Sequence, residues 1–303
     1  MAQGARTIMR RFLILTWAYT AFLTLVPVPT ANATGNFQNE ISLDYLREDD
    51  DSGYEGKFYG ATYTRYFLPI KTDTAPYAEA AFLEQVGDLS LSAAQGTAKF
   101  PTSPNLDMNS YGVSYNYAMP DTPWSFVLAY SKTKLHDSSQ GIDVPSDDVV
   151  FGLGRYYGYG KIVAIAYSHS TAEFDVSNVP VFDYEENDYG VVTKNVYTSD
   201  KGFSANLEAS ITVIYRNDTG NKTTNTDYSI GGDLYVTKEV SIGGSASKNT
   251  GEDSNIEGET YDARFVMYFS ALSSLELGYA RFVAANSATD DYNQTNFSIG
   301  VRF

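Results

Sequence analysis

The chain has 303 residues, no cysteine and a formal charge of −16 at neutral pH. The absence of cysteine excludes disulfides and thiolate zinc sites, and the strong negative charge argues against nucleic acid and anionic lipid as partners. The 25 tyrosines are amphipathic rings that settle where hydrocarbon meets water, which is typical of the aromatic girdles of membrane β-barrels.

The amino-terminal stretch has the pattern of an export signal. Three arginines give it a positive start, an apolar stretch follows over residues 12–26, and Ala-Asn-Ala at residues 31–33 gives the small-x-small cleavage pattern. An apolar stretch of about 15 residues is short for a helix that spans a bilayer. We therefore predict a signal peptide over residues 1–33 and a single outer-membrane domain over residues 34–303. The signal carries no acids, so its removal lowers the formal charge from −16 to −19.

From residue 36 onward, apolar and polar residues alternate, which is the period of a strand with one oily and one polar face. There are about 14 such segments, each near the length of about ten residues with which a tilted strand crosses a membrane. They are residues 37–46, 57–67, 77–91, 109–119, 124–136, 149–159, 161–174, 189–197, 203–216, 227–236, 240–248, 261–269, 275–285 and 296–303. The alternation is imperfect over 77–91, and the charges of 189–197 would also fit a loop.

The last segment alternates up to the final residue, with Phe297, Ile299, Val301 and Phe303 on one side. A soluble protein seldom presents such an apolar edge strand, because the edge invites pairing with other chains. A closed barrel needs this pattern, since its last strand pairs with its first. A terminal Phe on an alternating strand also resembles the signal that the outer-membrane assembly machinery reads. Phe303 is therefore the predicted assembly signal.

The connections between the segments alternate in length. Tight turns are expected at 119–123, 158–160, 198–201, 237–239 and 270–274, and longer polar links at 47–54, 92–108, 137–147, 175–188, 217–226, 249–260 and 286–295. Outer-membrane barrels have short periplasmic turns and longer external loops. The connection 68–76 is long for a periplasmic turn. We predict an all-β fold: an antiparallel transmembrane β-barrel of about 14 strands in the bacterial outer membrane.

A barrel of this size is wider than one that side chains can fill, so it encloses water unless a loop plugs it. The links 92–108 and 175–188 are the candidates to fold inward. With the oily face toward lipid, the opposite face supplies the candidate pore-lining residues. They are Glu40, Asp44, Glu208, Arg216, Asp233, Asp262, Arg264, Glu276 and Arg302. Acids in a water-filled pore favour cations; the alternative is that these charges pair with each other and only stiffen the wall.

The stretch Tyr66-Phe67-Leu68-Pro69, followed by Ala75-Pro76-Tyr77-Ala78-Glu79-Ala80-Ala81-Phe82-Leu83, resembles the segment at the same place in the general porin family of small Gram-negative outer-membrane proteins. The rest of the likeness is one of layout. The resemblance implies passive diffusion of small solutes, with no catalytic residue to carry over. Residues 78–83 fit either an inward-folded wall element or a packing feature, and we favour the packing feature.

Other polar motifs have simpler structural explanations. In Ser168-His169-Ser170 neighbouring side chains point to opposite faces of a strand, and His136 lies at the outer end of its strand, so neither predicts a catalytic pair. The run Glu48-Asp49-Asp50-Asp51 lacks the ligand spacing of an EF-hand, and we interpret it as a charged loop, with weak divalent binding as the alternative. Gly231-Gly232 and Gly243-Gly244 flank one turn and would let the wall bend.

The sequence thus predicts a passive, narrow, cation-preferring porin for small hydrophilic solutes, with no catalytic residue, cofactor or metal. The alternatives are a plugged structural or adhesive barrel and, as a weaker one, an outer-membrane lipid enzyme. Expected partners are outer-membrane lipid and lipopolysaccharide, the latter bridged by divalent ions, the barrel assembly machinery, and small hydrophilic solutes or ions. Association into a homo-oligomer is compatible with the pattern.

Overall fold

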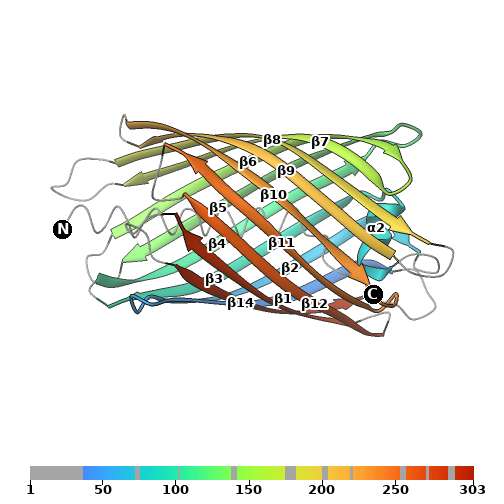
Figure 1. Cartoon of the computed structure of the whole chain (residues 1–303), viewed down its shortest axis with the longest axis horizontal. Coiled ribbons are helices and arrows are strands. Elements are labelled where there is room, and N and C mark those ends of the chain that lie inside the picture. Colours follow the sequence, from blue (N-terminus) through green and yellow to red (C-terminus); the bar gives the residue numbers. More distant parts are fainter. Residues whose placement is uncertain are drawn as a thin grey trace.

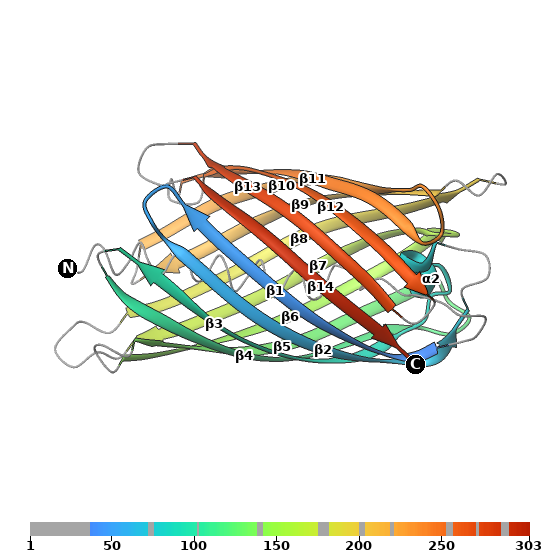
Figure 2. The same cartoon turned by 90° about the horizontal axis from the view of Figure 1, so that it is seen from below.

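The computed structural model of the chain describes residues 37–71, 76–101, 103–137, 142–174, 182–199, 204–218, 221–252, 257–270, 273–285 and 291–303. The signal peptide predicted over residues 1–33 lies outside this part of the chain. The described residues form one closed antiparallel barrel (Figures 1 and 2), which confirms the predicted fold. Within them, no helix is long and apolar enough to cross a membrane.

Fourteen strands and one short helical segment make up the described chain. They are β1 (Phe37–Asp50), β2 (Glu55–Ile70), η1 (Tyr77–Glu79), α2 (Ala80–Leu83), β3 (Asp88–Phe100), β4 (Ser103–Ala118), β5 (Trp124–Asp137), β6 (Ile142–Gly158), β7 (Lys161–Phe174), β8 (Phe182–Thr198), β9 (Ser204–Asp218), β10 (Asn221–Tyr235), β11 (Val240–Gly251), β12 (Gly258–Ser270), β13 (Ser273–Ala284) and β14 (Tyr292–Arg302). Each strand pairs with its neighbours in sequence, and β1 pairs with β14.

The first and last strands close the barrel as the terminal alternation predicted. Glu40 lies opposite Arg302 at the start of an unbroken register between β1 and β14. The Asn39 N–H donates to the Phe303 carbonyl at 2.9 Å, and the Phe303 N–H donates to the Asn39 carbonyl at 3.0 Å. We call the end of the barrel that holds Phe37 and Phe303 the terminal mouth and the other end the opposite mouth.

The outer surface is an apolar belt. Its outward side chains include Ile41, Leu43, Leu128, Ile165 and Ile230, all exposed. Toward the opposite mouth the belt ends in exposed tyrosines, and charged residues follow. These tyrosines include Tyr59, Tyr111, Tyr130, Tyr189, Tyr215, Tyr228, Tyr261 and Tyr279. Because a tyrosine ring suits the boundary between hydrocarbon and water, this is the surface of a barrel embedded in a membrane.

Several of the predicted element bounds are wrong. The segment 77–91, predicted as one strand, is a helical turn over 77–83 followed by β3 from Asp88. Ala, Glu and Leu, which dominate 78–84, are strong helix formers, and this explains the imperfect alternation. The link 92–108, predicted as an external loop that could fold inward, is almost entirely strand, as is most of 217–226. Small and polar residues continue the strands there without an apolar signal. Residues 182–188 of the link 175–188, the other candidate to fold inward, belong to β8, and the rest of that link lies outside the described residues. Residues 142–147 of the link 137–147 likewise belong to β6. The predicted segment 189–197 is confirmed within β8.

Candidate functional site

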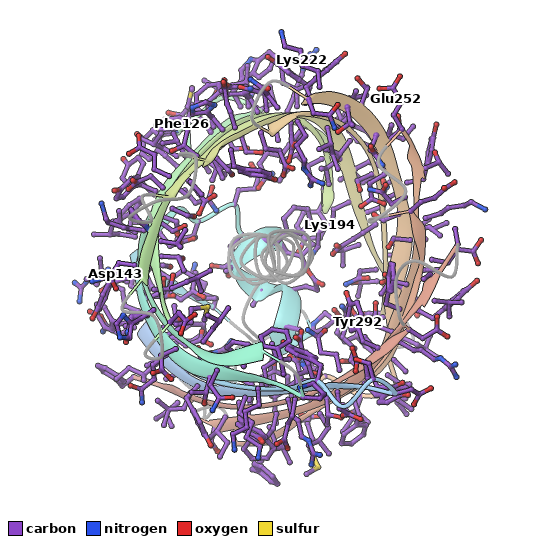
Figure 3. The ribbon with its side chains drawn as sticks, turned by 90° about the vertical axis from the view of Figure 1, so that its left-hand side faces the viewer. Phe126, Asp143, Lys194, Lys222, Glu252 and Tyr292 are labelled. Carbon is purple, nitrogen blue, oxygen red and sulfur yellow. The ribbon has the colours of Figure 1, made fainter. Side chains whose placement is uncertain are left out.

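The nine candidate pore-lining residues all occupy strand positions that face into the barrel. Inward and outward side chains alternate along each strand, as the burial of β5 shows. Viewed along the axis, Lys194 lies inside the ring of strands, and Phe126 and Asp143 lie outside it (Figure 3). The placement agrees with the predicted parity; whether these residues line a conducting pore stays a prediction.

The inward face has two unlike walls. Along β3 to β7 it carries mostly small residues. These include Ser90, Ser92, Ala94, Ser110, Gly112, Ser114, Ala129, Ser131, Gly152, Gly154, Ala164, Ala166, Ser168 and Ser170. All nine charged candidates lie on the other wall, from β8 through β14 to β1. Charge is therefore concentrated on one side of the lumen.

The inward charges of the described residues are mainly acidic. The inward cations are Lys194, Arg216, Arg264 and Arg302, and each forms an ion pair with at least one carboxylate. Many inward acids, by contrast, have no ion pair within 4.0 Å among the described residues. They are Asp44, Glu48, Asp88, Asp148, Asp188, Asp227, Asp262 and Glu276. The inward face of this part of the chain therefore carries uncompensated negative charge.

The connection between β2 and β3 folds into the barrel at the terminal mouth. Figure 3 shows the ribbon of η1 and α2 within the ring of strands. We call residues 76–87 the crossing segment. The Tyr77 ring meets Tyr268 of β12 edge-on at 5.7 Å, and Phe82 lies 5.7 Å from Tyr156 of β6. Leu83 packs with Val196 of β8.

The crossing segment also packs against the opposite side of the wall. Ala80 and Val86 are buried with Phe37, Tyr66 and Ile70 of β1 and β2. The segment therefore touches strands on several sides of the barrel and narrows the terminal mouth. The inward fold of residues 78–83, the interpretation that we did not favour from the sequence, is the one that the structure shows. It also accounts for the long connection at 68–76.

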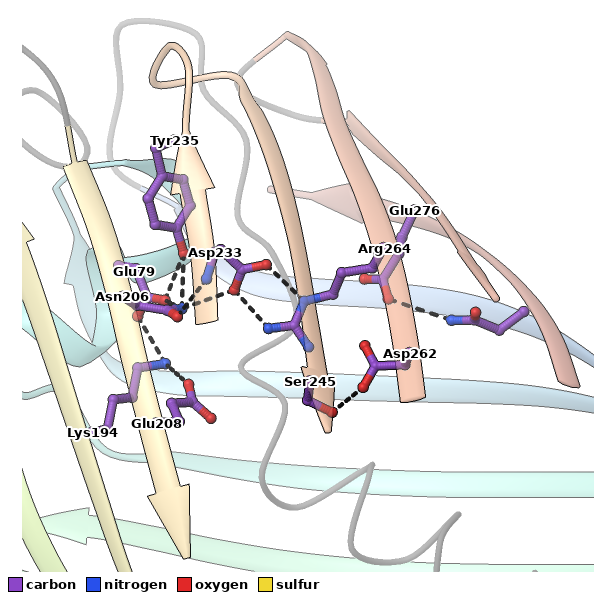
Figure 4. A network of polar contacts seen from close by, with 11 residues as sticks. Glu79, Lys194, Asn206, Glu208, Asp233, Tyr235, Ser245, Asp262, Arg264 and Glu276 are labelled. Atoms are coloured by element: carbon purple, nitrogen blue, oxygen red, sulfur yellow. Dashed lines mark hydrogen bonds and ion pairs between the residues drawn. The ribbon is translucent and has the colours of Figure 1, made fainter. Parts of the chain in front are cut away.

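Glu79 fixes the crossing segment to the wall through a buried polar network (Figure 4). It is 1% exposed, and its Oε1 accepts hydrogen bonds from Asn206 Nδ2 and the Tyr235 hydroxyl, both at 2.7 Å. Its Oε2 lies 2.9 Å from Lys194 Nζ, which is also 3.0 Å from Oε1 of Glu208. A buried charge is tolerated only with such partners, so this arrangement positions the segment firmly.

Asp233 and Arg264 extend the network across the sheet (Figure 4). The Arg264 guanidinium donates to both carboxylate oxygens of Asp233, at 2.7 and 2.6 Å, which is the strong bidentate geometry. Asn206 Nδ2 donates to Asp233 Oδ2 at 2.9 Å and so joins this pair to Glu79. Arg264 thus pairs with Asp233 rather than with Asp262, which accepts a hydrogen bond from Ser245.

Gly243 makes room for the Asp233–Arg264 pair. In the strand register Asp233 lies opposite Gly243, and Gly243 lies opposite Arg264, so the ion pair passes over the glycine. A Cβ at Gly243 would lie 1.9 Å from Asp233 Oδ1. The glycine pair, which the sequence interpretation assigned to bending of the wall, thus has the added role of admitting a salt bridge.

Gly243→Ala is therefore expected to break the Asp233–Arg264 pair and to lower the free energy of unfolding by about 1–3 kcal/mol. Denaturant unfolding in detergent micelles measures the change. Gly152→Ala is the matched control, because its nearest neighbour, the Ile165 carbonyl oxygen, would lie 3.6 Å from the new Cβ. Equal stabilities of the two variants would contradict the role given to Gly243.

Two of the nine candidates lie within packed wall rather than against open lumen. Glu40 and Arg302 are 1% and 2% exposed, and Arg302 Nε donates to Glu40 Oε2 at 3.0 Å. The Arg302 guanidinium lies 4.5 Å from the centre of the Phe37 ring. This pair fits the alternative in which charges stiffen the wall.

The remaining candidates have local partners. Arg216 Nε donates to Glu186 Oε2 at 2.6 Å, Ser42 Oγ to Asp44 at 3.4 Å, and Asn296 Nδ2 to Glu276 at 3.4 Å. Glu79 and Lys194, which organise the network, were missed in the sequence. Lys194 occupies a position of β8 whose side chain faces inward. The alternation of β8 is weak, but it was the one pattern in the sequence from which this position could have been found.

The inward face is apolar near the opposite mouth, where the sequence analysis expected it to be polar. The cluster consists of Tyr54, Phe58, Ala98, Met108, Leu135, Val144, Ala172 and Tyr184. Phe58 lies over Gly96 of the neighbouring strand, where a Cβ would lie 2.2 Å from the ring. These side chains come from the neighbouring strands β2 to β8 and the turn before β2, and they are buried against each other.

Neither histidine belongs to a catalytic arrangement in the described residues. His169 points outward and its Nδ1 lies 3.0 Å from Asn187 Oδ1, whereas Ser168 and Ser170 face inward. His136 Nδ1 lies 2.8 Å from Asp143 Oδ1 at the surface. The described residues contain no group of three or more His, Cys, Asp or Glu that could hold a metal ion. The interpretation of the acidic run as a charged loop is wrong, because residues 48–50 end strand β1 and Glu48 and Asp50 are buried. Asp50 accepts hydrogen bonds from Ser52 and Tyr54 and so stabilises the turn that follows.

The closed barrel is similar to solved outer-membrane barrels. The outer membrane protein Omp33 of Acinetobacter baumannii matches with a TM-score of 0.60 and 16% identity, over 89% of this chain and 100% of that chain. The deltaS2 mutant of the monoaromatic hydrocarbon channel TodX matches with a TM-score of 0.52 and 9% identity, over 89% of this chain and 90% of that chain. No family model and no curated protein matches the chain. The shared fold, together with the apolar belt, identifies the chain as a 14-stranded β-barrel of the bacterial outer membrane.

Proposed function

We propose that the chain is a passive, narrow porin that prefers cations among small hydrophilic solutes and ions. The observation that carries the proposal is the set of inward acids that no cation compensates. Negative charge lining a water-filled pore raises the local concentration of cations and repels anions. The layout shared with the general porin family and the fold shared with Omp33 and TodX support a channel. The terminal mouth faces the periplasm, as the end that holds both barrel termini does in this class.

Planar-bilayer recording tests the channel and its preference separately. With the mature protein and a tenfold KCl gradient, we expect discrete conductance steps and a reversal potential displaced toward the equilibrium potential of K⁺. A reversal potential displaced toward that of Cl⁻ would contradict the preference. The absence of any conductance step would contradict the proposal that the barrel is a channel.

A plugged structural barrel is the second candidate, because the crossing segment narrows the terminal mouth. Liposome swelling with sugars of graded size distinguishes the two functions. A narrow porin admits the smallest sugars and excludes larger ones, whereas a plugged barrel admits none. For the lipid-enzyme alternative, we expect no hydrolytic activity to be lost when His136 or His169 is replaced.

The outer surface supports the proposed partners. We propose outer-membrane lipid as the partner of the apolar belt. We propose lipopolysaccharide head groups and their divalent ions as the partners of the ion-paired residues beyond the tyrosines, such as Lys132 with Asp147 and Lys248 with Glu259. Phe303 is exposed at the terminal mouth, where the assembly machinery would bind it. No cofactor is needed for this function.

A further inference from the structure

A second acidic region lies on the inward face, away from the crossing segment. We call it the acidic patch: Asp148 of β6, Glu186 and Asp188 of β8, and Asp227 of β10. Ser170 of β7 lies between Asp148 and Glu186 in the strand register, which joins β6 to β8. Asp227 lies two strands from β8, because it pairs with Thr212 of β9, whose partner on β8 is Gly190. One cation, Arg216, neighbours it and binds Glu186 with contacts of 2.6 and 2.5 Å. The patch therefore keeps an excess of negative charge.

Asp188 is the most deeply buried member of the patch, and its charge has few partners. It is 2% exposed and forms no ion pair within 4.0 Å among the described residues. Its Oδ2 receives one long hydrogen bond, 3.5 Å from Ser168 Oγ, and its Oδ1 has no hydrogen-bond partner. Oδ1 of Asp227 also lacks a partner. Leaving a buried carboxylate without compensation costs several kcal/mol, so the protein must supply either a cation or a proton to Asp188.

We propose that the acidic patch is a binding station for a singly charged cation that enters from the lumen, centred on Asp188 and Asp227. Asp227 is only partly buried, so part of this side chain faces the lumen, whereas its unpartnered Oδ1 lies beneath the surface. No group of three acidic or histidine side chains in the described residues is close enough to hold a metal ion, which argues against a chelated divalent ion. Carboxylates and the hydroxyl groups of Ser168 and Ser170 suit an alkali cation or a protonated amine.

The station rests on the proposed function, because it identifies residues of the barrel wall that would cause the cation preference. A permeating ion must be bound strongly enough to enter and weakly enough to leave. Two carboxylate oxygens without partners, backed by hydroxyl groups, meet that requirement better than the Glu79 network. In that network Lys194 already compensates the charge.

Thermal unfolding tests the station without requiring conductance. A ligand that binds only the folded state raises Tm, so replacing tetraethylammonium chloride by RbCl at constant ionic strength should raise Tm of the mature protein by about 2–4 °C. A similar rise with methylammonium chloride shows that a protonated amine also binds; a rise with RbCl alone restricts the ligand to alkali cations. Asp188→Asn, which keeps the shape and removes the charge, should abolish the rise.

Asp44→Asn is the matched control, because it removes the same charge from the inward face of β1, and it should keep the rise. The second readout is the conductance measured at increasing KCl concentration. The conductance of the parent protein should saturate, whereas that of Asp188→Asn should rise almost linearly. If Asp188→Asn keeps both the rise in Tm and the saturation, the station is overturned and the channel stands. If the rise depends on Asp188 but no variant conducts, the station stands and the channel function fails. If RbCl does not raise Tm of the parent protein, Asp188 holds a proton instead of a cation, and this result also overturns the station.

Discussion

Replacing residues 71–86 with a linker of about six glycine and serine residues should raise the single-channel conductance several-fold. The linker still joins β2 to β3 but removes the crossing segment, whose side chains contact β1, β2, β6, β8, β9, β10 and β12 at the terminal mouth. A barrel of this strand number is too wide for its wall side chains to fill, so removing the segment leaves an open mouth. Single-channel recording in symmetric KCl measures the change.

The turn at residues 120–122 provides the control, because it lies at the same mouth. A Gly/Ser substitution there should leave the conductance unchanged. Glu79→Gln tests the attachment alone: it keeps the hydrogen-bonding shape but removes the charge that faces Lys194, so we expect more frequent transitions between conductance levels. If the linker variant conducts like the parent, the narrowest part of the path lies elsewhere in the barrel.

Arg302→Ala should be the most destabilising single substitution in the wall, lowering the free energy of unfolding by about 3–5 kcal/mol. The substitution leaves Glu40 buried without its partner at the seam where β1 meets β14, and it removes the guanidinium packed on Phe37. Unfolding by guanidinium chloride in lipid vesicles measures the change.

Arg281→Ala is the matched control, because its ion pair with Asp291 is 3.3 Å long and exposed at the surface. Exposed pairs contribute about 0–1 kcal/mol, so the control should remain close to the parent. The double variant Glu40→Gln, Arg302→Met should recover most of the loss, since neither side chain is then an unpaired charge. Equal losses for Arg302→Ala and Arg281→Ala would show that the seam does not depend on the buried pair.

The barrel could be predicted from the sequence because its main signal is local. Apolar residues at every second position, such as Phe297, Ile299 and Val301, mark the side of a strand that faces lipid. Every strand of the barrel faces lipid on one side, so the pattern recurs along the chain. Strand ends were less accurate: at 92–108 small and polar residues continue β3 and β4 without an apolar face to lipid. The parity rule also placed the candidate pore residues on the inward face.

The interior arrangement could not be predicted, because it depends on contacts between distant parts of the chain. Glu79 has no local signal that selects Asn206 and Tyr235 as its partners. Arg264 pairs with Asp233 rather than with Asp262, which is nearer in the sequence, and Gly243 leaves the space for that pair. The apolar cluster around Phe58 breaks the rule that inward means polar. The alternation along a strand predicts whether a side chain faces inward or outward. It does not predict which other residues that side chain contacts.

The attachment of Glu79 also has a consequence for the order of biogenesis. Its hydrogen-bond partners Asn206 and Tyr235 follow it by 127 and 156 residues. Contacts so remote along the chain form only after the intervening hairpins have been laid down. Residues 76–87, although synthesised early, therefore reach their final place when most of the cylinder already exists, and the narrowing of the terminal mouth is a finishing step of barrel construction.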